Sequence, residues 1–191
     1  PTLVRETNGL GNTWKVELVD STAYVVDHDG RLHVLDVSSP REPSLLRSID
    51  VPGAPRDAAL LGDRLFLALG GAGVEVYDIS DRADPRSIGH IDVLGSAQSV
   101  AASGETIAIA AWSHVAIHDA ETLTLLATEK TRPRAQFEQN LGVAMVDDVV
   151  IVAEWEGLHL YRHRPGYVAP DLWLDEDMIA FDAEELDARA V

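Results

Sequence analysis

The chain has 191 residues, no cysteine, and 15 basic against 32 acidic residues, which give a formal net charge of −17. So acidic a chain excludes nucleic acid and anionic membranes as partners, because both bind positive surfaces. The missing cysteine excludes disulfides and thiol catalysis, and no apolar run approaches the roughly 18 residues of a membrane-spanning helix, so we expect no membrane insertion.

The predicted elements are short β-strands that recur along the chain. Segments rich in Val, Leu, Ile and Tyr alternate with turns of Asp, Ser, Gly and Pro, which is typical of antiparallel sheets. The predicted strands of the first two modules are 15–19, 23–26, 32–37, 44–49, 58–61, 65–69, 74–79 and 87–91. Those of the last two are 99–102, 107–111, 115–118, 122–128, 143–146, 149–153 and 158–161. No long segment has helical periodicity.

The modules repeat with a period close to 42 residues. Leu-Asp-Val-Ser at 35–38 returns as Tyr-Asp-Ile-Ser at 77–80, as His-Asp-Ala-Glu at 118–121 and as Tyr-Arg-His-Arg at 161–164. A fixed period of this size indicates stacked modules, and modules of up to four strands indicate blades of an all-β propeller. The expected blades are 13–54, 55–97, 98–139 and 140–164, the last completed by residues 1–8.

Two of these modules resemble a known repeat family. The segments Leu-His-Val-Leu-Asp-Val-Ser-Ser-Pro-Arg-Glu-Pro (32–43) and Val-Glu-Val-Tyr-Asp-Ile-Ser-Asp-Arg-Ala-Asp-Pro (74–85) are similar to the LVIVD repeat. The resemblance implies a β-propeller and a bacterial or archaeal protein that is exported or lies at the cell surface. It supplies no catalytic motif and no functional residues.

The ends of the chain leave two interpretations open. Either residues 2–7 pair with 158–161 and close a ring of four blades, or the chain is part of a larger propeller of about six to eight blades. Residues 165–191 are strongly acidic, with eight carboxylates between 167 and 191 against Arg189 alone. We interpret 165–191 as an acidic linker or the start of a further domain.

Polar residues at the entries to the innermost strands form the candidate site. They recur at the 42-residue period, so the propeller would gather them around one channel mouth. The predicted ligand-binding residues are Trp14, Arg56, Asp57, Gln98 and Asn140. The structural alternative is that they solvate a channel and tie neighbouring blades together through Arg56 and Asp57.

Evidence for metal sites and catalysis is weak in the sequence. Asp27-His-Asp-Gly resembles half of a calcium loop, but a β-turn explains the same pattern without an ion. The seven histidines are spaced too far apart along single strands to share a metal, so we expect exposed blade histidines. Trp112 and Trp155 fall at matching places and predict either repeated packing positions or an aromatic rim for a carbohydrate or peptide.

The sequence therefore predicts a non-catalytic propeller scaffold that binds a protein or glycan partner outside the cytoplasm. It has no catalytic residues, no metal ligands and no required cofactor in this interpretation. The alternative is a cation-dependent, hydrolase-like or small-ligand-binding propeller that uses the channel mouth. Calcium is the cofactor that this alternative would allow, although Asp57 is the only carboxylate among the candidate residues.

Overall fold

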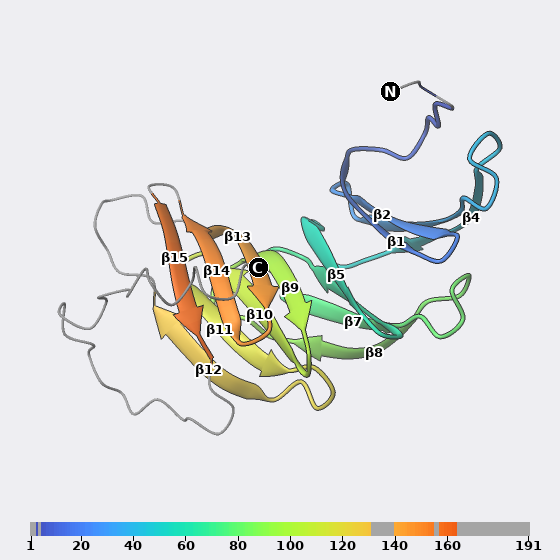
Figure 1. Cartoon of the computed structure of the whole chain (residues 1–191). Coiled ribbons are helices and arrows are strands. Elements are labelled where there is room, and N and C mark those ends of the chain that lie inside the picture. Colours follow the sequence, from blue (N-terminus) through green and yellow to red (C-terminus); the bar gives the residue numbers. More distant parts are fainter. Residues whose placement is uncertain (1–2, 4, 131–139, 155–156, 164–191) are drawn as a thin grey trace.

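The computed structural model describes residues 3, 5–130, 140–154 and 157–163, and every regular element within them is a β-strand. Figure 1 shows the strands gathered into four successive sheets, which we call blades 1 to 4. Blade 1 contains β1 (Thr13–Val19), β2 (Thr22–Asp27), β3 (Arg31–Asp36) and β4 (Ser44–Asp50). Blade 2 contains β5 (Asp57–Leu61), β6 (Arg64–Ala68), β7 (Val74–Asp78) and β8 (Arg86–Ile91). Blade 3 contains β9 (Ala97–Ser103), β10 (Thr106–Ala111), β11 (His114–Asp119) and β12 (Leu125–Lys130), and blade 4 contains β13 (Asn140–Val146), β14 (Val149–Glu154) and β15 (Gly157–Arg162).

Each blade is an antiparallel meander in which neighbours in sequence are neighbours in the sheet. The first three blades have four strands, and the described part of the fourth has three. The first strand of each blade is the inner one: β1 lies beside β5, β5 beside β9, and β9 beside β13. The predicted strands are therefore all present, in the predicted order.

The repeated aspartate at the end of the third strand in blades 1, 2 and 3 caps the turn that follows. The carboxylates of Asp36 and Asp78 each accept a hydrogen bond at 2.8 Å from the amide two residues on, and Asp119 does the same for Glu121 at 3.0 Å. Hydrogen bonds from Ser38 to Asp36, from Ser80 to Asp78 and from Thr122 to Asp119 lower the pKa of these three carboxyl groups. The Asp column of the repeat is thus a turn-capping column.

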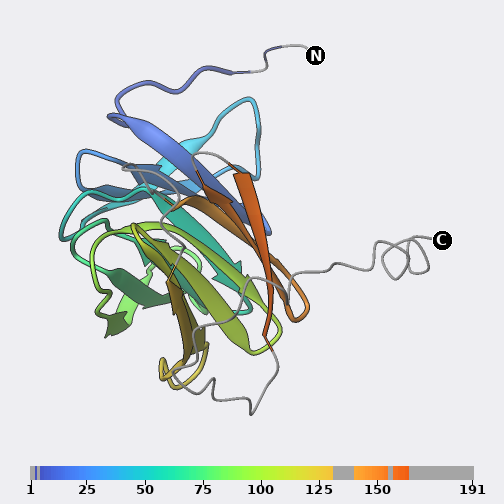
Figure 2. The same ribbon diagram turned by 90° about the vertical axis from the view of Figure 1, so that its left-hand side faces the viewer.

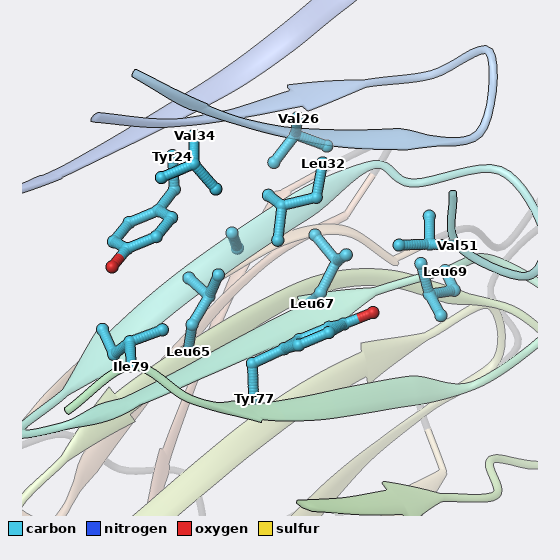
Figure 3. Close-up of a cluster of buried hydrophobic side chains, with 11 residues drawn as sticks. Tyr24, Val26, Leu32, Val34, Val51, Leu65, Leu67, Leu69, Tyr77 and Ile79 are labelled. Carbon is cyan, nitrogen blue, oxygen red and sulfur yellow. The ribbon is translucent and has the colours of Figure 1, made fainter. Parts of the chain in front are cut away.

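The hydrophobic core lies between the blades as three separate layers. Figure 3 shows the layer between blades 1 and 2, where Tyr24 and Leu32 face Leu65, Leu67 and Tyr77. A second cluster joins blades 2 and 3, and a third joins blades 3 and 4. Each blade is therefore stabilised by its neighbours, as in other stacked repeats.

The strand boundaries differ from the prediction mainly in blade 3. The predicted strand 122–128 begins only at Leu125, because residues 121–124 form a turn around the Asp119 carboxylate, which accepts hydrogen bonds from the amides of Glu121 and Thr122. Leu123 has a φ of 61°, a left-handed conformation that ends any strand. The turn pattern of Asp119 overrides the β-propensity of Thr122 and Thr124.

The four blades form an open fan, with blades 1 and 4 at its two ends (Figure 1). Residues 3 and 5–8 adopt no strand, and β15 is the last strand of blade 4 among the described residues. Figures 1 and 2 show residues 5–10 running beside blade 1, away from β15. The side chain of Leu3 is exposed. Residues 1–2 and 4 and the acidic segment 165–191 lie outside the described residues. The described ranges contain no helix that is long and apolar enough to cross a membrane.

Candidate functional site at the entries to the inner strands

The 42-residue period brings two of the predicted site residues into direct contact. Arg56 and Gln98 precede and begin the inner strands of blades 2 and 3, and the Nη1 of Arg56 donates to the Oε1 of Gln98 at 3.0 Å. The Gln98 amide in turn donates to the hydroxyl of Ser96 at 2.8 Å. The Nε of Arg56 is buried and has no hydrogen-bond partner among the described residues. The guanidinium is thus tied to blade 3 through Nη1, and its Nε is not accessible to a ligand at the surface.

Trp14 is held flat at the same end of the fan. Its indole stacks on the imidazole of His28 with ring centroids 3.9 Å apart and an angle of 5° between the planes. The guanidinium carbon of Arg56 lies 5.9 Å from the indole centroid, within the range of a cation–π contact. The Nδ1 of His28 lies 2.9 Å from the carbonyl oxygen of Pro55, so the stack joins blade 1 to the segment before blade 2. Even so, Trp14 remains 52% exposed.

His28 was not singled out as a site residue from the sequence. Its role follows from register, because β1 pairs antiparallel with β2 and places Thr13 opposite Asp27. The entry to β1 and the turn after β2 are therefore neighbours. This signal is readable only once the strand pairing is known.

Asp57 is the centre of a line of polar contacts that runs across all four blades. Its carboxylate lies 3.3 Å from the ammonium of Lys15, accepts from the hydroxyl of Ser99, and accepts from the amide of Val100 at 3.1 Å. The hydroxyl of Ser99 then accepts from the amide of Val143 at 3.2 Å. Burial opposes the charged form of Lys15, but the nearby carboxylates outweigh it and raise the pKa of this side chain. These contacts tie blades together and leave Asp57 little capacity for a ligand.

Asn140 lies apart from the exposed group. It is fully buried, and its amide donates to the carbonyl oxygens of Ala111 and His114, each at 2.9 Å. Its backbone amide donates to the carbonyl of Trp112 at 3.1 Å. Asn140 therefore fixes blade 4 to the hairpin of blade 3, and a ligand at the surface would not touch it.

A second tryptophan lies on the same end of the molecule. Trp112 follows β10, donates its backbone amide to the carbonyl of Ser96 at 3.0 Å, and is partly exposed. Trp155 lies outside the described residues. We call the surface made by Trp14, His28, Arg56, Gln98 and Trp112 the entry face.

The calcium-like segment is a turn. Gly30 donates to the carbonyl of Asp27 at 3.0 Å and has a φ of 103°. The Asp27 carboxylate is fully buried and accepts from the amides of Asn12 and Asp29 at 2.9 and 3.0 Å. Among the residues that the structure describes, no three His, Asp or Glu side chains are grouped to hold a metal ion.

The expectation of exposed histidines is wrong for several of them. The structure buries His33, His114, His118 and His163. His33 is packed between strands, with its Nδ1 2.8 Å from the hydroxyl of Ser48, and burial lowers the pKa of His118. A histidine on a blade face can be buried in the core when a neighbouring polar group forms a hydrogen bond with its ring nitrogens.

Four antiparallel blades, joined by equivalent contacts at equivalent inner-strand positions, define a β-propeller repeat protein. The LVIVD repeat model matches residues 10–51 and 52–93, so the first two blades are LVIVD repeats. Among solved structures, the computationally designed Ika4 protein is similar with a TM-score of 0.66 and 14% identity over 86% of this chain and 99% of that one. The computationally designed Ika8 protein is similar with a TM-score of 0.64 and 14% identity over 84% of this chain, which spans only 48% of Ika8. No curated protein matches the chain.

Proposed function

We propose that this propeller is a non-catalytic binding module that presents its entry face to a protein or glycan partner. The observation that carries the proposal is Trp14, which is half exposed although stacking on His28 and the contact with Arg56 fix its plane. An indole held in place loses little side-chain entropy when a ligand covers it. Large aromatic side chains of this kind dominate binding energies at interfaces.

The chemistry around Trp14 narrows the partner to one with an apolar or sugar face next to a hydrogen-bond acceptor. The indole offers a flat apolar surface, and the guanidinium of Arg56, 5.9 Å from the indole centroid, places a positive charge beside it. A pyranose ring with a neighbouring carboxylate or hydroxyl fits this pair, as does a peptide with an aromatic residue beside an acidic one. Trp112 would extend the same surface toward blade 3.

We place this activity outside the cytoplasm, and the support is the resemblance to exported and surface proteins. The absence of cysteine is compatible with that compartment. Fractionation of the source cells with an antibody to the chain tests the location. Recovery in the periplasm, cell wall or medium is expected, and recovery in the cytosol alone would overturn it.

The binding proposal is tested by selecting ligands on the wild-type chain from a glycan array and a displayed peptide library. Trp14→Ala should weaken the selected ligands by about tenfold or more, as expected for a tryptophan hot spot. Ile88→Ala is the matched control, because Ile88 is 50% exposed but lies on the outer strand β8. Ligands that bind Trp14→Ala as tightly as the wild type would remove the entry face from the proposal.

A further inference from the structure

The two blades at the ends of the fan each expose an apolar sheet face. On blade 1 the outward row runs from Leu18 through Ala23 and Leu35 to Leu45, which are directly paired across the four strands. The next row begins with Val16 and Val25. Leu18 is 60% exposed, and Val16 and Leu45 are exposed to a similar degree, whereas Ala23 and Leu35 in the middle of the row are buried.

Blade 4 exposes a corresponding face on its other side. Ala144, Ile151 and Leu160 form one row across β13, β14 and β15, and Ala153 pairs with Leu158 in the next. Leu158 is 65% exposed and Leu160 is 39% exposed. The opposite face of the same sheet, with Val150 and Val152, is packed against blade 3.

The period identifies what the face of blade 1 is built to contact. The places of Val16, Leu18, Ala23, Val25 and Leu35 are taken in blade 2 by Ala58, Leu60, Leu65, Leu67 and Tyr77. All five of these blade 2 residues pack into the cluster shared with blade 1, and Figure 3 shows Leu65, Leu67 and Tyr77 among them. The outward face of blade 1 is therefore the surface that receives a preceding blade.

The face of blade 4 is the complementary half of that interface. Ile151, Ala153, Leu158 and Leu160 take the places of Tyr24, Val26, Leu32 and Val34, which are the blade 1 residues buried against blade 2. In blade 2 the same places are filled by Phe66, Ala68, Val74 and Val76, buried against blade 3. The outward face of blade 4 is therefore the surface that a following blade covers.

Both halves of one repeated interface are thus present on a single chain, at opposite ends of an open fan. Residues 10–12 cover one end of the blade 1 face, where Gly11 meets Asp27 and the carbonyl of Leu10 lies 3.1 Å from the Nε2 of His33. They leave Val16 and Leu18 exposed. Exposed apolar side chains gathered on one sheet face mark interaction sites.

We propose that the occupant of these faces is a second copy of this chain, with blade 4 of each copy packed on blade 1 of the other. Two equal interfaces then form at once and close a ring of eight blades, which leaves no unpaired blade face. The assembly does not depend on what binds at the entry face.

The test is the mass of the chain in solution, measured by light scattering during size-exclusion chromatography at physiological ionic strength, where repulsion between the acidic chains is screened. The wild type should have twice the 20.7 kDa of one chain. Leu18→Arg and Leu160→Arg should each be monomeric, because each introduces charge into one half of the interface. Ile88→Arg, on a half-exposed residue outside both faces, should stay dimeric.

Mixing the two disruptive variants separates head-to-tail packing from any other dimer. The chain with Leu18→Arg keeps an intact blade 4 face, and the chain with Leu160→Arg keeps an intact blade 1 face, so the mixture should form a dimer although neither variant does alone. Circular dichroism shows whether each variant is folded. A monomeric wild type, an open-ended polymer, a dimer that survives Leu18→Arg, or folded variants that fail to pair when mixed would each overturn the proposal.

Discussion

At the scale of residues, the inner-strand positions divide into a connecting set and an exposed set. Lys15, Asp57 and Ser99 satisfy one another across blade boundaries. Trp14 and Arg56, one residue earlier in each blade, face the surface. Adjacent residues on a strand point in opposite directions, so one repeat supplies both structure and a binding surface.

Removing the carboxylate of Asp57 should lower the free energy of unfolding, while all blades stay folded. Asp57→Ala leaves the Lys15 ammonium, the Ser99 hydroxyl and the Val100 amide without their shared partner. Loss of such buried partners costs about 1–3 kcal/mol in the free energy of unfolding. Urea denaturation measures it, and Asp50→Ala, whose carboxylate is exposed and pairs with Arg31 at 3.3 Å, is the control with no measurable change. Equal stability of the two variants would show that the line of contacts across the blades does not stabilise the molecule.

At the scale of elements, the hairpin between β2 and β3 is anchored by a buried carboxylate. Burial raises the pKa of Asp27, but hydrogen bonds from the amides of Asp29 and Asn12 and the proximity of His33, 3.5 Å away, outweigh it and lower the pKa. A lowered carboxyl pKa contributes stability above the unfolded pKa of about 3.9. That contribution is lost as the pH falls through the lower pKa of the folded state.

The wild type should therefore lose more stability in acid than Asp27→Asn. The difference in unfolding free energy between the two chains should be largest near neutral pH and shrink below about pH 4. Urea midpoints measured at several pH values give this difference directly. A difference that stays constant from neutral to acid pH would show that ionised Asp27 is not what anchors the hairpin.

The same scale shows how far the sequence could be read. Short β-type segments and a 42-residue period were enough to predict every strand, because hydrophobic alternation and turn residues are local signals. The contact of Arg56 with Gln98 follows from the period alone. The stack of His28 on Trp14 and the burial of His33 do not, because they depend on strand register and on the path of residues 10–12. The predicted start of β12 was wrong because the preceding turn is held by hydrogen bonds to the side chain of Asp119.

At the scale of the whole molecule, the same kind of interface joins successive blades three times. Its two sides also occur uncovered, one on blade 1 and the other on blade 4. Buried clusters join blades 1 to 2, 2 to 3 and 3 to 4. The free faces of blades 1 and 4 repeat the same positions with apolar residues. A chain of stacked repeats needs such faces covered to remain soluble, and closure into a ring covers both.

Small-angle X-ray scattering from the wild-type chain in solution tests this account most directly, because it reports mass and shape together. The account predicts a forward scattering that corresponds to two chains and a profile that fits a closed ring of eight blades. A forward scattering of one chain with the profile of an open four-bladed fan would contradict it.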